Sequence, residues 1–444
     1  MSARQPWAGR RIHLVGVGGA GMSAYARAAD ALGAEVSGSD AAETEQTRAL
    51  AEEGVLVAAI GHDAANLPAG GEVELYYSSA VPEDNPERAA ARERGLAEHP
   101  RADLLGELSA LRRTIAVAGT HGKTTTSSML VHILRAAGME PAWLVGAPVG
   151  GGLPNASWSD GEWLVVEADE SDRSMLSLDV EIAVLTNVEL DHHATFSSLA
   201  ALREDFRTLL AAAREEVVWD RPELLELAGT TAVAYAPEEL ELTRGGSRFR
   251  WRGELVTLGV PGAHNALNAA GALEAARLAG AGPAPAIAAL AAFTGAGRRF
   301  QRLGRSAGGA EIYEDYAHHP TEVAATLRGA RTLGHRRLIA VFQPHLFSRT
   351  AMLAADFGRA LAEADVVAVL DVYPARERAE DFPGVSGLTI ARAAADAAGG
   401  RPVYWLPGFE QAETVLEGML GRGDVCVVMG AGDVDALARR LVAP

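Results

Sequence analysis

Two apolar segments of this chain each run into a glycine-rich turn and then into a helical stretch, and this repeated unit constrains the fold most strongly. The first segment, residues 11–17, leads through the turn 18–22 into an alanine-rich stretch. The second, residues 114–118, leads through residues 119–126 into a helix expected over 127–137. Apolar strands without alternation are typical of parallel sheets with helices on both faces. We therefore expect an α/β protein.

Further apolar segments extend this pattern into three blocks. Glycine-rich or charged breaks near residues 107 and 297 separate the blocks. We expect three α/β domains, at residues 1–107, 108–297 and 298–444. The additional strands expected in these domains lie at residues 55–57, 74–77, 163–166, 182–186, 337–342, 366–370 and 425–429.

The charge balance and the cysteine content narrow the functional classes. With 40 basic and 58 acidic residues the net charge is −18. A chain of this charge has no positive electrostatic field that would attract a nucleic acid or an anionic membrane. The single cysteine, Cys426, cannot form an internal disulfide, and its apolar neighbours predict a buried strand position. No stretch of eighteen uncharged apolar residues occurs. We expect a cytoplasmic protein that acts on small molecules.

The first glycine turn matches the pattern G-x-G-x-x-G between a strand and a helix. Asp40 follows the last glycine of this motif by nineteen residues, at the end of the next expected strand. In dinucleotide-binding folds the start of the helix holds a diphosphate, and an acid at this spacing lies near a ribose hydroxyl. The motif is compatible with an NAD site, with a site for a UDP-linked ligand, or with a purely structural turn.

Lys123 is singled out by composition alone. Of the 40 basic residues, 39 are arginine and Lys123 is the only lysine. A compact ammonium and a guanidinium fork are not interchangeable among phosphate oxygens. Lys123 lies in G-T-H-G-K-T at residues 119–124, the end of a phosphate loop, although the full pattern has glycine where this chain has Val117. We expect the loop amides and Lys123 to bind phosphates, and the Thr124 hydroxyl to bind Mg²⁺.

Acidic residues and a histidine follow two further apolar strands of the central block. Glu167 begins the run E-A-D-E-S-D, and His192 lies in N-V-E-L-D-H-H. The carboxyl ends of parallel strands meet at the edge of a sheet where ligands bind. The carboxylate of Glu167 suits Mg²⁺, whereas an imidazole at His192 suggests a second site that tolerates softer ligands. The alternative is that these acids cap helices.

Two polar segments lie beside strands of the third block. Residues 315–320 read D-Y-A-H-H-P, and residues 343–349 read Q-P-H-L-F-S-R. The adjacent histidines could indicate zinc, but neighbouring strand residues point to opposite faces and no third ligand is evident. Arg349 could hold a small carboxylate through two parallel hydrogen bonds, or it could form a surface salt bridge.

Taken together, these motifs resemble the Mur ligase family over nearly the whole chain. The resemblance also rests on S-S-A-V at residues 78–81, N-P-E at 85–87 and H-N-x-x-N at 264–268. It implies a Rossmann-like amino-terminal domain for a UDP-sugar acid, a P-loop parallel-sheet domain for ATP, and a Rossmann-like carboxyl-terminal domain that largely binds the amino acid. Some related ligases use a carbamoylated lysine for metal binding, which a chain with Lys123 as its only lysine excludes. The resemblance thus favours the alanine-adding branch.

The resemblance also implies roles for individual residues. Catalytic roles fall to Lys123, His192 and Arg349, and metal binding falls to Thr124, Glu167 and His192. Grouped by ligand, the expected positions are Gly119, Thr120, His121, Gly122, Lys123, Thr124, Thr125, Asn265, Asn268, Arg299 and Asp315 for ATP; Gly16, Gly18, Gly19, Gly21, Ser39, Asp40 and Ser79 for the UDP-sugar; and His319, His345 and Arg349 for the amino acid.

The implied reaction is an ATP- and Mg²⁺-dependent ligation in peptidoglycan precursor synthesis. The lactyl carboxylate of UDP-N-acetylmuramate is activated as an acyl phosphate and captured by L-alanine. A recycling ligase that attaches a whole murein peptide to the same UDP-sugar is the alternative within the family. An NAD-dependent oxidoreductase would leave Lys123 without a role, and a P-loop regulatory NTPase would leave the first glycine motif without one.

One departure from the family pattern concerns the amino-acid site. Alanine ligases often have arginine where this chain has Leu346, so Arg349 is expected to carry more of the carboxylate binding. We expect the protein to be a monomer or a weak homodimer.

Overall fold

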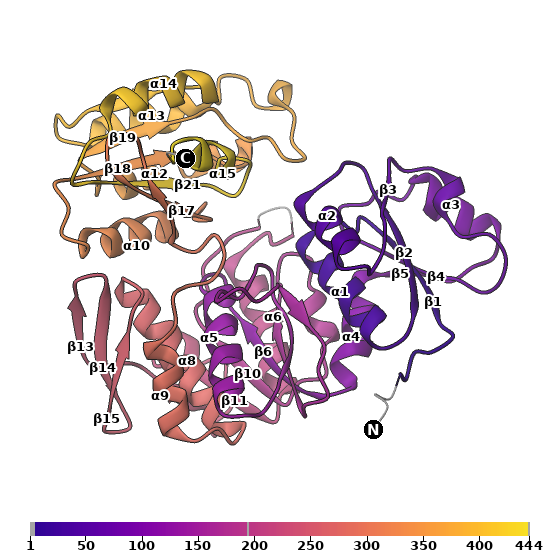
Figure 1. The fold of residues 1–444 in the computed structure, drawn as a ribbon. Helices are drawn as coiled ribbons and strands as arrows, with labels where there is room; N and C mark the ends of the chain where they lie inside the picture. The colour runs from indigo at the N-terminus through magenta and orange to yellow at the C-terminus, as the bar shows by residue number, and fades with distance from the viewer. Residues whose placement is uncertain (1–4, 193–194, 443–444) are drawn as a thin grey trace. The chain divides into compact units, whose positions relative to one another are not determined.

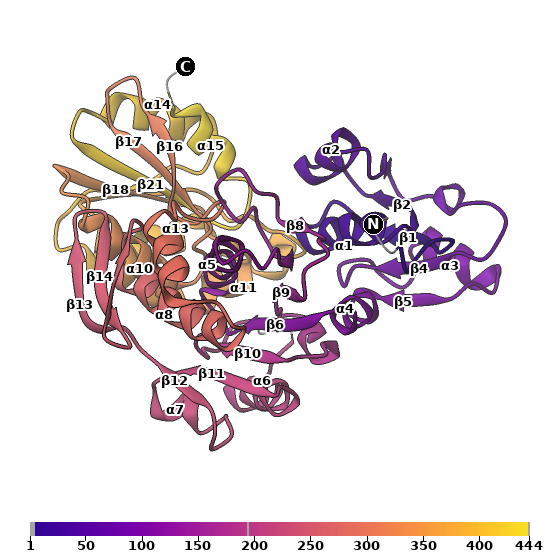
Figure 2. The same cartoon turned by 60° about the horizontal axis from the view of Figure 1, so that its bottom comes forward.

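The computed structural model describes residues 5–192 and 195–442, and the chain divides into two compact units. Each unit contains layers of helices on mostly parallel sheets, which confirms the expected α/β class (Figure 1, Figure 2). Unit 1 comprises residues 1–237 and 267–293, and unit 2 comprises residues 238–266 and 294–444.

The first sheet of unit 1 is parallel throughout. From one edge to the other its strands are β3 (Ala59–Ile60), β2 (Glu35–Asp40), β1 (Arg11–Val15), β4 (Glu74–Tyr77) and β5 (Glu98–Pro100). Its helices are α1 (Ala20–Ala31), α2 (Glu45–Glu52), α3 (Pro86–Glu93) and α4 (Arg101–Ala110), with a short turn of 3-10 helix at Ala64–Asn66. The strand expected over residues 55–57 is wrong. Leu56 is buried but Val57 is 85% exposed. This apolar run therefore places one side chain, that of Leu56, in the core before β3 begins.

The second sheet of unit 1 is parallel except for one edge strand. In order across the sheet its strands are β12 (Val233–Tyr235), β11 (Glu215–Trp219), β10 (Ile182–Leu185), β6 (Arg113–Ala118), β9 (Trp163–Glu167), β7 (Ala142–Leu144) and the antiparallel β8 (Ala156–Ser157). The helices are α5 (Lys123–Ala136), η2 (Ser174–Ser177), α6 (Leu199–Ala212), α7 (Pro222–Leu225), α9 (Pro283–Ala291) and the part of α8 (Ala263–Leu278) from residue 267 onward. Helix α5 begins at Lys123, earlier than expected, because the glycine turn leads directly into its first turn.

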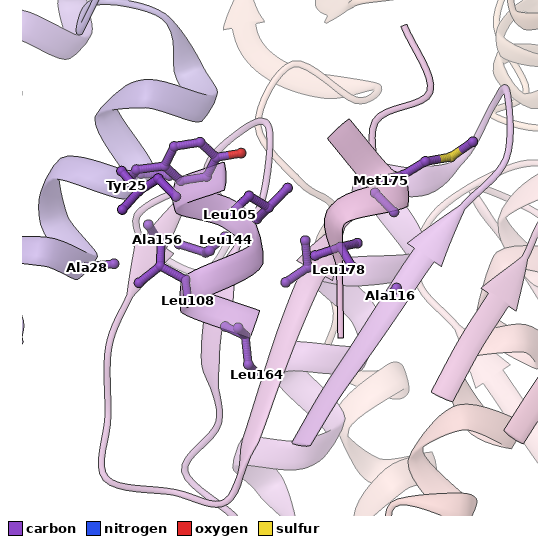
Figure 3. Close-up of a cluster of buried hydrophobic side chains, with 14 of the residues drawn as sticks. Tyr25, Ala28, Leu105, Leu108, Ala116, Leu144, Ala156, Leu164, Met175 and Leu178 are labelled. Atoms are coloured by element: carbon purple, nitrogen blue, oxygen red, sulfur yellow. The ribbon is translucent and has the colours of Figure 1, made fainter. Parts of the chain in front are cut away.

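One hydrophobic cluster of buried side chains joins the two sheets of unit 1 (Figure 3). Tyr25 and Ala28 of α1 and Leu105 and Leu108 of α4 belong to the same buried cluster as Leu164 of β9. Helix α4 also carries the chain from β5 to β6, so the sheets are held together by a covalent connection and by buried apolar surface. Both glycine turns therefore belong to one compact unit.

Unit 2 contains a six-stranded sheet whose edge strand β16 is antiparallel and whose other pairs are parallel. In order its strands are β16 (Gln301–Arg305), β17 (Glu311–Asp315), β21 (Asp424–Met429), β18 (Arg337–Phe342), β19 (Val366–Val369) and β20 (Val403–Trp405). The helices are α10 (Pro320–Arg331), α11 (Phe347–Met352), α12 (Ala354–Leu361), α13 (Gly387–Ala397), α14 (Phe409–Met419) and α15 (Asp435–Arg440), with 3-10 helix at Ala379–Asp381.

Alternate residues of the central strands of this sheet face two separate cores. Phe342 of β18 packs in one core with residues of α10, α12 and α13, whereas Ile339 packs in the other with residues of α14 and α15. Cys426 lies in the second core and is fully buried, as expected, and burial raises the pKa of its thiol to about 12. Helices thus cover both faces of the sheet.

Unit 2 also contains an antiparallel sheet of three strands, β13 (Glu238–Thr243), β14 (Gly246–Trp251) and β15 (Glu254–Leu258). The sequence analysis did not predict these strands. In the described part of the chain no helix is long and apolar enough to cross a membrane. The domain boundaries expected near residues 107 and 297 remain predictions.

Candidate functional site

The first glycine turn lies between β1 and α1, at the carboxyl edge of the first sheet. Gly16 has a φ of +84°, and a Cβ there would lie 3.0 Å from Ser78. Asp40, at the end of β2, accepts a hydrogen bond from the Gly18 amide at 2.8 Å. A Cβ at Gly18 would lie 2.9 Å from the same carboxylate. Asp40 and the turn are therefore in direct contact, and the acid holds the backbone of the turn.

The other expected UDP-sugar residues lie at the same edge. Gly19 immediately precedes α1, and Gly21 lies in the first turn of that helix. Ser79 is exposed just beyond β4, which is the neighbour of β1. The carboxyl ends of β1, β2 and β4 thus bring these positions to one side of the sheet, as open parallel sheets require for a ligand site.

Ser39, also expected to contact the UDP-sugar, takes part in a buried network around Glu87 of α3. The Ser39 hydroxyl donates to Glu87 at 2.7 Å, and the same carboxylate accepts hydrogen bonds from His13, His62 and Asn66 at 2.7, 3.0 and 3.2 Å. Burial opposes ionisation, but these hydrogen bonds outweigh it and lower the pKa of Glu87 to about 2. Sequence reasoning missed this network, and the N-P-E motif that contains Glu87 was its signal.

The second glycine turn joins β6 to α5. Gly119 has a φ of +125°, and a Cβ there would collide with the Thr186 hydroxyl. Gly122 has a φ of +84°, and a Cβ would lie 2.6 Å from Asn268. Only glycine fits at either position. Asn268, one of the residues expected to bind ATP, therefore lies against the loop that leads into α5.

Lys123 is the first residue of α5, and its ammonium donates three hydrogen bonds. The acceptors are the Gly119 carbonyl at 2.7 Å, the Thr120 carbonyl at 3.2 Å and the Glu170 carboxylate at 2.8 Å. Burial leaves the side chain only 12% exposed and disfavours the charge, but the attraction of Glu170 outweighs this and raises the pKa of Lys123. A charged ammonium thus lies across the loop that is expected to hold phosphates.

Oxygen ligands lie next to this loop. Thr124 Oγ1 donates to Glu167 Oε1 at 2.9 Å, and Glu167 Oε2 accepts from the Gly146 amide at 2.7 Å. Glu170 Oε1 is buried and makes no hydrogen bond within the described residues, although His192 Nε2 lies 3.4 Å away. A hydroxyl and carboxylate oxygens are the ligands that Mg²⁺ prefers. The residues present therefore fit a divalent cation.

The remaining loop residues are held by the segment that follows β10. The His121 amide donates to Asn187 at 2.9 Å, and the His121 ring lies 3.0 Å from the Glu189 carboxylate. Thr120 Oγ1 donates to the Glu189 carbonyl at 2.9 Å, and Thr125 is buried in the first turn of α5. The expected ATP residues of unit 1 therefore surround one turn.

In unit 2, Asp315 ends β17 at the carboxyl edge of the six-stranded sheet. It accepts hydrogen bonds from the amides of Phe300 and Ala317 at 2.8 and 2.7 Å. Burial raises the pKa of Asp315 to about 6, and the attraction of Arg299 offsets only part of that effect. The Arg299 guanidinium lies 5.1 Å from the centre of the Tyr316 ring. Sequence reasoning did not single out Tyr316.

The expected amino-acid residues follow β18 and precede α10. Arg349 is 5% exposed, and its Nη1 lies 3.3 Å from His345 Nδ1. The ring of His318 lies with its centre 6.1 Å from that of His345. His319 instead caps α10, where its Nδ1 accepts from the Thr321 amide at 3.4 Å. His318, which was not among the expected residues, is thus the member of the pair whose ring faces His345.

Two further positions of unit 2 are Leu346, where the chain departs from the family pattern, and Asn265, which is expected to bind ATP. Leu346 has a φ of +68°, which is strained for a leucine, and its amide donates to the Tyr373 carbonyl at 3.0 Å. This turn leads directly into α11, which carries Arg349. Asn265, in the first turn of α8, donates to the Pro261 carbonyl at 2.7 Å.

Comparison with known proteins identifies the family to which the chain belongs. Three family models match consecutive parts of the chain: the Mur ligase family catalytic domain at residues 11–113, the Mur ligase middle domain at 117–276 and the Mur ligase glutamate ligase domain at 298–432. Curated UDP-N-acetylmuramate–L-alanine ligases of Mycolicibacterium vanbaalenii and Rubrobacter xylanophilus are 41% and 42% identical to this chain. Each match covers 98% of this chain and 96% or 99% of the relative.

Solved structures of two ligases also match nearly the whole chain. A UDP-N-acetylmuramate–alanine ligase from Thermotoga maritima matches with a TM-score of 0.84 at 28% identity, covering 97% of this chain and 98% of that one. A murein peptide ligase from Psychrobacter arcticus matches with a TM-score of 0.70 at 25% identity, covering 98% of both chains. With relatives of this identity over nearly its full length, and with family models that match all three blocks, the chain belongs to the Mur ligase family.

Proposed function

We propose that this chain joins L-alanine to the lactyl carboxylate of UDP-N-acetylmuramate, at the expense of ATP, in peptidoglycan precursor synthesis. The chain is an ATP-dependent ligase of the Mur family, and the relatives at 41% and 42% identity are named for this reaction. One observation at the site carries the proposal. The only lysine of the chain places its ammonium across a glycine turn, between two backbone carbonyls and Glu170.

The reaction follows from the poor electrophilicity of a carboxylate. A lactyl carboxylate oxygen forms a bond to the γ-phosphorus of ATP, and ADP leaves. The amine of L-alanine then attacks the acyl carbon, inorganic phosphate leaves, and the new amide nitrogen loses a proton. When ATP binds, the Lys123 ammonium donates its hydrogen bonds to phosphate oxygens in place of the Gly119 and Thr120 carbonyls. Its positive charge then offsets the negative charge on the phosphoryl group being transferred. The turn amides bind the phosphates at the start of α5.

We assign Mg²⁺ binding to Thr124 and Glu167, and a second position to His192. The 2.9 Å contact between the Thr124 hydroxyl and Glu167, and the orphaned oxygen of Glu170, support this assignment. When bound, the ion supplies positive charge beside the phosphates. The Gly146 amide orients Glu167 by donating to its second oxygen.

The other assignments rest on the resemblance to the family. The edge formed by β1, β2 and β4 takes the UDP-sugar, and Asn265, Asn268, Arg299 and Asp315 serve the nucleotide. Arg349 binds the carboxylate of L-alanine, and its low exposure beside His345 supports a fixed guanidinium there.

Two broader assignments belong to the proposal as well. We place the protein in the cytoplasm, and the single buried thiol of Cys426 is consistent with a reducing compartment. We also propose a monomer or a weak homodimer.

A ligase that attaches a whole murein peptide is the second candidate, because the Psychrobacter arcticus enzyme matches 98% of this chain. The higher TM-score of the alanine ligase and the identity of the curated relatives favour L-alanine. Phosphate release with ATP and UDP-N-acetylmuramate distinguishes the two when L-alanine, the murein tripeptide and no acceptor are compared. Release that requires the tripeptide and ignores L-alanine would contradict the proposal.

A further inference from the structure

Arg101 is the first residue of α4, the helix that connects the two sheets of unit 1. Its side chain is 13% exposed. The Nε atom donates to Asp172 at 2.5 Å, and Nη2 donates to Asp169 at 2.9 Å and to Ser174 at 3.2 Å. Both acids belong to the E-A-D-E-S-D run that begins at the end of β9. Strand β9 lies in the same sheet as β6, which leads into the second glycine turn. One edge of the guanidinium is therefore fixed to the central sheet.

The other edge of the same guanidinium lies against the first glycine turn. A Cβ at Gly21 would lie 2.8 Å from Arg101 Nη1. Gly21 does not have a positive φ, so its backbone would accept a side chain. The last glycine of the motif is thus explained by the room that it leaves for Arg101. Tyr25, one turn further along α1, interacts with the same guanidinium.

The acids that hold Arg101 also shape the turn that holds Lys123. Asp169 accepts a hydrogen bond from the Ser171 amide at 2.9 Å, and Asp172 accepts one from the Ser174 amide at 3.1 Å. Glu170 lies between these two acids in the sequence and accepts from Lys123 at 2.8 Å. A displacement of Arg101 would therefore move the turn that places Glu170 against the only lysine.

We propose that Arg101 is a positioning residue. It fixes the position of the first glycine turn, which we assign to the UDP-sugar, relative to the second glycine turn, which we assign to ATP. The inference rests on the proposed function, because it concerns how the two substrates meet. The first step needs the lactyl carboxylate within bonding reach of the γ-phosphorus, and a misplacement of about 1 Å can cost on the order of a hundredfold in rate. Arg101 contacts the first turn of α1 on one side, and on the other it contacts Asp169 and Asp172, which flank Glu170, the partner of Lys123.

The variants Arg101→Lys and Arg101→Met test this role, and Arg27→Met is the matched control. Arg27 is a buried arginine of α1, and it joins that helix to Asn155 at 2.9 Å and to Glu53. Among the described residues, none of these hydrogen bonds involves residues 169–174. For each variant we would measure kcat and each KM. Calorimetry would give the Kd of UDP-N-acetylmuramate with and without a non-hydrolysable ATP analogue. Thermal unfolding would report stability.

We expect kcat of Arg101→Lys to fall roughly ten- to a hundredfold, with a KM for L-alanine within about twofold of the parent value. The ratio of the two Kd values should differ from 1 in the parent, move toward 1 in both Arg101 variants, and stay at the parent value in Arg27→Met. Arg27→Met should lower the unfolding temperature without lowering kcat.

Folded Arg101 variants with the parent kcat and the parent Kd ratio would overturn the proposal, and so would a parent ratio of 1. Equal losses of kcat in the Arg101 and Arg27 variants would show a merely structural role and would also overturn it. If the Arg101 variants do not fold, Asp172→Asn removes one acceptor and must change kcat and the ratio in the same direction. A parent protein that releases no phosphate with L-alanine refutes the proposed function instead, while the Kd ratio still tests Arg101.

Discussion

Replacing Lys123 with arginine keeps the charge and changes only its shape. The ammonium now donates to the Gly119 carbonyl, the Thr120 carbonyl and Glu170, all within 2.7 to 3.2 Å. A guanidinium is planar and broader, and its donors diverge in a fixed fork. The backbone carbonyls belong to a turn in which Gly119 has no room even for a Cβ, so we expect the guanidinium not to meet all three acceptors.

The size of the effect follows from the contacts that are lost. A hydrogen bond to a charged group is worth about 1.5–3 kcal/mol. If arginine keeps only one of the three contacts after phosphate oxygens have replaced the two carbonyls, the loss of two contacts is about 3–6 kcal/mol, or roughly a hundredfold to ten-thousandfold in kcat. We therefore expect Lys123→Arg to fold normally and to lose nearly all turnover.

The assay is L-alanine-dependent release of phosphate, accompanied by thermal unfolding. Arg135→Lys is the matched control, because Arg135 is an exposed residue in the last turn of the same helix. That exchange should leave kcat and the unfolding temperature unchanged. Near-normal turnover in a folded Lys123→Arg protein would refute the reasoning from the only lysine, since the shape of the cation would then not matter.

Three further predictions concern amino-acid binding, stability and the ligand of the first glycine turn. Arg349→Ala should raise the KM for L-alanine roughly tenfold to more than a hundredfold and change that for ATP little, because a charge-assisted contact of about 1.5–3 kcal/mol is removed; a lost response to ATP instead would move Arg349 to the nucleotide site. Glu87 has a pKa lowered from 4.5 to about 2, so it should contribute about 3 kcal/mol of stability above pH 4.5 that is lost as the pH falls toward 2. Urea unfolding at pH 7 and pH 3 should show a smaller pH dependence in Glu87→Gln, and an unchanged dependence would exclude this role. Calorimetry should detect binding of UDP-N-acetylmuramate and none of NAD or NADP; tight NAD binding lost in Gly18→Ala would reverse the assignment of the first turn.

The parts of the fold that follow from local sequence were predicted well. Residues 114–118 form β6 because a continuous apolar run suits a strand buried on both faces. The turn after it was recognisable because Gly119 and Gly122 adopt positive φ, which side chains rarely tolerate. The strand expected at residues 55–57 failed because periodicity over three residues cannot distinguish a strand from a single buried Leu56.

Other features could not be predicted because their partners are distant in the sequence. Glu87 meets His13 across 74 residues, and Arg101 meets Asp169 across 68. Such contacts depend on how strands are ordered in the sheets, which no local pattern specifies. The three-stranded sheet was missed for another reason. Exposed glutamates of β13 hid the alternation of buried Phe249 and Trp251 in the neighbouring strand β14.

The first glycine motif shows why its pattern alone left three interpretations open. Of the three glycines that define it, only Gly16 adopts a positive φ. Gly18 is small because the Asp40 carboxylate and a neighbouring hydroxyl occupy the space where its side chain would lie, and Gly21 is small because Arg101 does. A pattern of glycines indicates that another group occupies the place of a side chain, but it does not identify that group. The ligand class must therefore be inferred from the groups that surround the glycines. In this chain Arg101 connects the motif to Asp169 and Asp172, close to the second glycine turn.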